Sequence, residues 1–107
     1  MAFDRNGKVL DDYTYEIAKT AVSEGRDELV VLFNGIIYDI GVSTNGILKE
    51  YRKKNPDKYL DDDPFDPLWC CCTENEILLI APRETIMDEI VIDGQQLEEI
   101  WPKITLL

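Results

Sequence analysis

Residues 28–40 read Glu-Leu-Val-Val-Leu-Phe-Asn-Gly-Ile-Ile-Tyr-Asp-Ile, and this stretch decides the fold class. Two runs rich in β-branched and aromatic residues flank Asn34-Gly35, a pair that accepts the positive φ angles of a tight two-residue turn. Apolar residues occur on both faces of the first run, which is typical of a strand inside a sheet. The stretch therefore predicts a β-hairpin with a central first strand and a second strand that ends near Gly41.

A helix is predicted before this hairpin, over residues 10–24. Apolar side chains recur there at intervals of three and four, the pattern of an amphipathic helix. Asp11 and Asp12 fall in the first turn, where carboxylates cap amide groups and meet the positive end of the helix dipole. Gly25 is the expected stop.

A shorter helix is predicted after the hairpin, with Ser43 or Thr44 as its N-cap and its end near Lys54. Residues 55–67 follow as a loop, because three prolines and five aspartates leave little for a strand ladder to use.

The second half of the chain predicts a further hairpin, in which residues 68–72 and 77–80 flank a polar turn. Residues 86–92 are predicted as another strand. Asp93, with Gln96 three residues later, resembles a capping box and is expected to open a last helix that Pro102 ends.

This order of elements predicts a single α+β domain over residues 1–107. Hairpins without long crossovers imply a mainly antiparallel sheet of about five strands, with about three helices packed against it. No apolar run approaches the roughly 18 residues of a membrane helix, and no secretory signal is visible at the start. The three cysteines are consecutive and form no disulfide framework, so we expect a cytoplasmic protein.

The charge of the chain restricts its partners. It carries 22 acidic and 11 basic residues, a net charge of −11, and residues 59–107 hold 12 of the acidic and two of the basic ones. Binding to nucleic acid or to an anionic membrane requires clustered Lys and Arg, so neither is expected as a partner. A basic protein is the expected partner.

The composition also argues against catalysis and against a bound cofactor or metal. The chain has no histidine, which excludes Ser-His and Cys-His catalysis and His-containing zinc sites, and it has no glycine-rich phosphate loop. The aspartates between residues 61 and 66 lack the alternation and the glycine of a calcium loop. Two carboxylate pairs, Asp88/Glu89 and Glu98/Glu99, are interpreted as solvated surface.

Cys70, Cys71 and Cys72 are interpreted as small buried side chains of a strand. Successive side chains of a strand point to opposite faces, so Cys70 and Cys72 are expected on one face and Cys71 with Trp69 on the other. A reactive thiol would require nearby cations, and this region has almost none.

The predicted partner-binding residues combine steering charges with aromatic anchors. They are Asp61, Asp62, Asp63 and Asp66 as charges, Tyr59, Phe65 and Trp69 as anchors, and Glu74 and Glu76 as an extension of the patch.

In length, acidity, element order and lack of catalytic groups, the chain resembles the immunity proteins of bacterial contact-dependent growth inhibition systems. The resemblance implies a cognate basic toxin, such as a nuclease, whose active site this protein would cover in the cytosol. An acidic protein suits that role because the active site of a nuclease is electropositive.

Three alternatives stay open from the sequence. One is a phage-type mimic of nucleic acid, although the basic segment 49–58 argues against it. Another is a structural or regulatory subunit of a larger assembly, in which residues 104–107 and 49–58 dock a partner or a second copy. A small enzyme that uses carboxylates or thiols is the third. The expected state is a monomer or a weak homo-oligomer.

Overall fold

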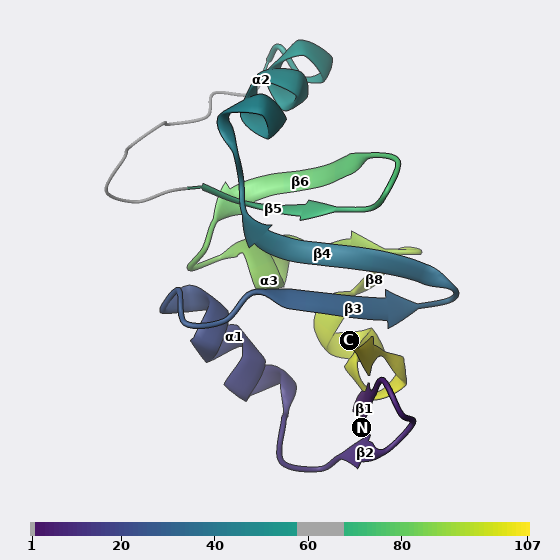
Figure 1. Cartoon of the computed structure of the whole chain (residues 1–107). Coiled ribbons are helices and arrows are strands. Elements are labelled where there is room, and N and C mark those ends of the chain that lie inside the picture. Colours follow the sequence, from purple (N-terminus) through teal and green to yellow (C-terminus); the bar gives the residue numbers. More distant parts are fainter. Residues whose placement is uncertain (1, 58–67) are drawn as a thin grey trace.

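The computed structural model describes residues 2–57 and 68–107 (Figure 1). In these residues, seven strands form one sheet and two more form a separate hairpin. The predicted α+β class and the mainly antiparallel sheet are confirmed, with more strands than expected. In chain order the elements are β1 (Ala2–Asp4), β2 (Val9–Leu10), α1 (Tyr15–Ser23), β3 (Leu29–Phe33), β4 (Ile36–Val42), α2 (Asn45–Lys54), β5 (Leu68–Cys72), β6 (Ile77–Pro82), α3 (Ile86–Glu89), β7 (Val91–Ile92), β8 (Gln95–Gln96), α4 (Leu97–Ile100), the 3-10 helix η1 (Trp101–Lys103) and β9 (Thr105–Leu106).

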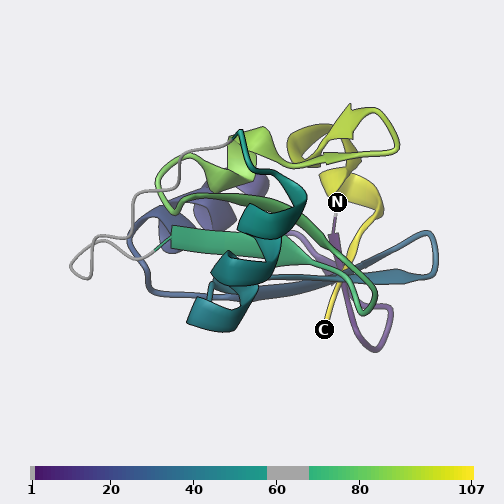
Figure 2. The same ribbon diagram turned by 90° about the horizontal axis from the view of Figure 1, so that it is seen from above.

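The helices cover the two faces of the sheet unequally. The strand order is β2-β1-β9-β3-β4-β5-β6, in which β1 runs parallel to β9. Helices α1, α3 and α4 lie on one face, where side chains such as Val22, Ile86 and Leu97 are fully buried in the main core (Figure 2). Burying one such aliphatic side chain contributes about 1.5–3 kcal/mol to stability.

Helix α2 lies on the opposite face of the sheet (Figure 2). Its Leu48 and Tyr51 form a smaller buried cluster with Cys70 of β5 and Ile80 of β6. Thr44 caps the helix, as predicted, by accepting a hydrogen bond of 3.2 Å from the amide of Ile47. Within residues 2–57 and 68–107, no helix has the length and hydropathy needed to cross a bilayer.

Helix α1 begins later than predicted. Its N-cap is Thr14, whose Oγ1 accepts a hydrogen bond of 3.3 Å from the amide of Ile17. Leu10, predicted as the first residue of the helix, belongs to β2 instead, so Asp11 and Asp12 precede the helix rather than fill its first turn. A short strand that pairs with β1 has overridden the helical periodicity here.

Gly25 ends α1 as predicted, with a φ of 70°. The amide of Gly25 donates to the carbonyl of Val22 at 2.9 Å, and that of Arg26 donates to the carbonyl of Ala21 at 2.8 Å. This pair of hydrogen bonds is the Schellman motif, which satisfies the last carbonyls of a helix.

The β3–β4 hairpin is confirmed at its predicted turn. Asn34 and Gly35 have φ angles of 51° and 77°, and Phe33 pairs with Ile36 directly across the turn. Strand β3 lies between β9 and β4, which confirms the interior position predicted from its two apolar faces.

The β5–β6 hairpin is also confirmed, and its first strand has the predicted bounds. Trp69 and Cys71 belong to the main core, whereas Cys70 and Cys72 pack on the α2 face. The predicted alternation of the cysteines is therefore confirmed.

The strand predicted over residues 86–92 is confirmed only at residues 91–92, which form β7, and the predicted helix start at Asp93 is wrong. Residues 86–89 form the short helix α3 instead of a strand, and Ile86 and Met87 pack into the main core. Asp93 does not cap a helix: it occupies the turn between β7 and β8, with a φ of 53°. Helix α4 is capped by Gln96, which forms a capping box with Glu99.

The predictions did not include β1, β2 and β9. Strand β9 lies between β1 and β3, so Thr105 and Leu106 are part of the sheet. Ile104 is fully buried. The apolar segment 104–107, expected to dock a partner, is thus used largely within the fold.

Candidate protein-binding site

A groove of about 810 Å³ opens beside the first residues of β4. Four segments line it, namely residues 35–39, 72–76, 78 and 91–93. Its described lining contains no Lys or Arg but holds four carboxylates, those of Asp39, Glu74, Glu76 and Asp93. We call this feature the acidic groove.

One wall of the acidic groove is the turn between β5 and β6, which Thr73 holds in shape. The Thr73 amide donates to the carbonyl of Glu76 at 2.8 Å. The Thr73 hydroxyl oxygen accepts hydrogen bonds from the amides of Asn75 and Glu76, at 3.3 and 3.2 Å. These bonds leave Glu74 and Glu76 exposed at the groove.

A hydrogen bond between two tight turns places the carboxylate of Asp93. Asn34-Gly35 and Asp93-Gly94 are both two-residue turns with positive φ angles, as type I′ hairpins require. Nδ2 of Asn34 donates to Oδ2 of Asp93 at 3.1 Å. The β3–β4 and β7–β8 hairpins are thereby joined at one end of the groove.

The acidic groove also presents aliphatic side chains to solvent. Ile36, Ile37 and Val91 are 46%, 51% and 58% exposed. Large exposed aliphatic side chains among carboxylates are suited to anchoring a partner after charge has oriented it. No sequence pattern singled out these three residues.

Tyr38 also lines the groove but is buried, with 5% of its surface exposed. Burial raises the pKa of its hydroxyl, and the negative charge of Asp93 raises that pKa further. The Tyr38 hydroxyl is therefore neutral at physiological pH, and the charge of the groove comes from its carboxylates.

The structure brings together only part of the predicted binding patch. Glu74 and Glu76 lie in the acidic groove. Trp69, predicted as an anchor, is 2% exposed and packs in the main core, so the described surface does not offer its ring to a partner. Six of the predicted residues lie outside the described part of the chain, namely Tyr59, Asp61, Asp62, Asp63, Phe65 and Asp66.

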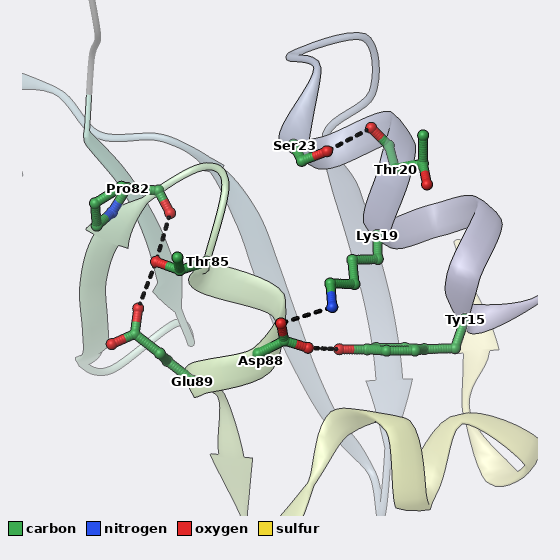
Figure 3. Close-up of polar contacts among 8 residues, drawn as sticks. All are labelled: Tyr15, Lys19, Thr20, Ser23, Pro82, Thr85, Asp88 and Glu89. Atoms are coloured by element: carbon green, nitrogen blue, oxygen red, sulfur yellow. Dashed lines mark hydrogen bonds and ion pairs between the residues drawn. The ribbon is translucent and has the colours of Figure 1, made fainter.

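The carboxylate pair Asp88/Glu89 has structural contacts within the fold (Figure 3). Asp88 accepts a hydrogen bond from the Tyr15 hydroxyl at 2.9 Å and lies 2.7 Å from Nζ of Lys19. These contacts lower the pKa of Asp88, with the Lys19 contact as the largest cause. Glu89 accepts a hydrogen bond of 2.9 Å from the Thr85 hydroxyl. The two carboxylates thus have separate partners on different elements.

Burial governs the chemistry of the cysteine thiols. It raises the pKa of Cys70 and of Cys71 to about 12 and is also the main cause of the raised pKa of Cys72. All three thiols are therefore protonated near neutral pH. Across residues 2–57 and 68–107, no three Cys, Asp or Glu side chains are grouped so that they could hold a metal ion.

Comparisons of the chain with protein-family models, with curated proteins and with solved structures found no match.

Proposed function

We propose that this chain is an inhibitor that binds a basic protein through the acidic groove. In its most concrete form it is an immunity protein that covers the active site of a cognate toxin, such as a nuclease. The observation that carries the proposal is the groove itself, in which four carboxylates surround three exposed aliphatic side chains without a described cation.

Charge and apolar contact have different roles in this mechanism. The net charge of −11 attracts an electropositive surface and raises the association rate from about 10⁵–10⁶ toward 10⁸–10⁹ M⁻¹s⁻¹ at low salt. Burial of Ile36, Ile37 and Val91 against the partner then slows dissociation, since most differences in affinity between related complexes lie in that step. A nuclease covered in this way loses access to its substrate.

The test is capture of the partner from a lysate of the protein's source, followed by an activity assay. The wild-type chain is expected to retain a basic protein at moderate salt and to abolish its enzymatic activity in the complex. The double variant Glu74→Lys/Glu76→Lys is expected to lose both effects.

The matched control is Asp11→Lys/Asp12→Lys, which changes the net charge equally at two exposed residues outside the groove. Equal loss or equal retention in both variants would show that the acidity acts without a defined site, and the proposal would be abandoned.

A mimic of nucleic acid is less well supported, because one region of the surface is basic. Lys49, Arg52 and Lys53 of α2 line a depression of about 500 Å³ that is separate from the acidic groove. A phosphate mimic would require carboxylates over most of its binding surface.

A role as an assembly subunit is favoured by one observation. Cross-strand pairs place Val9, Phe3, Thr105, Leu32 and Ile37 in a single row across five strands. Val9 and Ile37, at its two ends, are 39% and 51% exposed. A second copy packed on this row would give a molecular mass that rises with concentration, which analytical ultracentrifugation measures.

A further inference from the structure

The acidic groove contains a stretch of β4 that has a described neighbour on one side only. Ile36, Ile37 and Tyr38 pair with β3. On the other side, β5 pairs only with residues 39–42 of β4, because its last residue, Cys72, lies opposite Asp39. Beyond β5 the chain turns toward β6 (Figure 1). Residues of that turn and of β4 both line the groove.

The main-chain groups of Ile37 point into this opening. In a two-residue hairpin the residues that flank the turn, here Phe33 and Ile36, exchange both of their hydrogen bonds. Because hydrogen-bonded and non-bonded pairs alternate, Tyr38 bonds to β3 and Ile37 points away from it. Asp39 points in the same direction as Ile37 and meets Cys72 of β5. Ile37 therefore presents one amide and one carbonyl along the line of β5.

We propose that the acidic groove receives an extended segment of the basic partner, which adds as a strand beside residues 36–38 of β4. The inference rests on the proposed function, since it concerns the same groove and the same partner. An added strand gains main-chain hydrogen bonds from Ile37, whereas its side chains determine which sequences fit.

The two faces of the sheet predict how those side chains alternate. The partner residue opposite Ile37 lies on the same face as Ile37 and Asp39, so a Lys or Arg there meets a carboxylate. Its two neighbours lie on the face of Ile36 and Tyr38, on the side of the apolar residues of β7, and are expected to be apolar. The segment that fits is thus basic and apolar in alternation.

Amide hydrogen exchange by NMR tests the open edge in the free protein. Asp39 is a matched control for Ile37, because both amides point away from β3 and only Asp39 has a described strand beside it. The Ile37 amide is expected to exchange at least about tenfold faster than the Asp39 amide. Equal protection of both amides in the free protein would mean that the edge is already paired, and would overturn the proposal.

The second arm adds the probe acetyl-Lys-Val-Lys-Val-Lys-amide at concentrations up to about millimolar, the range expected of weak peptide contacts. The Ile37 amide is expected to become protected. In an antiparallel pairing, the one that β5 has with β4, the lysine amides face β4 and the valine amides face away. N-methylation of the lysine amides should therefore abolish that protection, and N-methylation of the valine amides should not.

The results separate this inference from the proposed function. Shifts at Glu74 and Glu76 without protection of Ile37 would mean that charge alone holds the peptide. No binding of the peptide at all would equally overturn strand addition. In both cases the capture experiment with the basic partner still stands as the test of the inhibitor role.

Discussion

The Tyr15 hydroxyl donates a hydrogen bond of 2.9 Å to Oδ1 of Asp88, and so connects helix α1 with helix α3 across 73 positions of the sequence. The second carboxylate oxygen of Asp88 lies 2.7 Å from Nζ of Lys19, one turn farther along α1. A single side chain thus meets two partners on a neighbouring helix (Figure 3).

Replacing Asp88 is expected to weaken this connection. Asp88→Ala leaves the partly buried Tyr15 hydroxyl without its acceptor, and we expect a loss of about 1–2 kcal/mol in the free energy of unfolding. Urea denaturation followed by fluorescence measures the loss. Glu50→Ala is the control, because it removes only an exposed ion pair with Lys54 and should change stability by less than about 0.5 kcal/mol.

The same carboxylate predicts a dependence of stability on acid. Contacts with Lys19 and Tyr15 lower the pKa of Asp88 below its ordinary value of 3.8, so the unfolded chain binds a proton more readily than the folded one. The contribution of ionised Asp88 to the free energy of unfolding is complete above the pKa of the unfolded state and is lost as the pH falls through the pKa of the folded state. The free energy of unfolding of wild type should therefore fall more steeply below about pH 4 than that of Asp88→Asn. Parallel curves for the two proteins would contradict the assignment.

Thiol labelling tests the burial of the cysteines. With a pKa of about 12 against the ordinary 9.0, the thiolate fraction of Cys70 and Cys71 at pH 8 is about a thousandth of that of a free thiol. We expect iodoacetamide to modify the partly exposed Cys72 first in the folded protein, and all three cysteines together in urea. Peptide mapping by mass spectrometry identifies the site, and rapid labelling of Cys71 in the folded state would argue against a core position.

The Asp93 turn is expected to tolerate glycine better than a branched residue. Asp93→Gly gives up the hydrogen bond from Asn34 but suits the φ of 53°, so its stability should lie within about 1 kcal/mol of wild type. Asp93→Val also forces a β-branched residue into the left-handed region and should cost about 1–2 kcal/mol more. Thermal unfolding of the two variants gives the comparison, and equal stability would contradict the turn geometry.

Association kinetics can rank the two acidic regions once a partner is in hand. We expect Glu74→Gln/Glu76→Gln to slow association and to flatten its salt dependence, because both carboxylates line the groove. The triple change of Asp61, Asp62 and Asp63 to Asn tests the patch predicted from sequence in the same way. Stopped-flow measurement of the association rate at several salt concentrations distinguishes the two regions. A variant whose association rate is unchanged shows that its region is not part of the interface.

The elements that could be predicted from sequence carry strong local signals. Asn34-Gly35 between two apolar runs located the β3–β4 hairpin, and Thr44 before an amphipathic stretch located α2. Strands β1, β2 and β9 have two or three residues each, which is too few to show an alternating pattern of apolar and polar residues. They form because they pair with one another and with β3. Helix α3 has four residues, little more than one turn, so its apolar residues resembled a strand.

The groove was predictable only in part, for a related reason. Glu74 and Glu76 belong to a turn that its own sequence marks, whereas Asp39 and Asp93 reach the same place through pairing between distant strands. Asp93-Gly94, like Asn34-Gly35, is a typical pair for a two-residue hairpin turn, but Asp93 was predicted to be the N-cap of a helix. Nothing local indicates that Ile36 and Ile37 stay exposed, because that depends on where β5 stops.

The position of β9 also governs the order in which this protein can assemble. Among the described strands, β9 alone connects the β1–β2 hairpin to the rest of the sheet, and it lies about a hundred residues away along the chain, parallel to β1. Because β9 follows every other described element, a ribosome releases it after all of them. The β1–β2 hairpin, although synthesised first, can therefore join the sheet only after β9 has been synthesised. Completion of the seven-stranded sheet is thus a late step that depends on a contact between the two ends of the described chain.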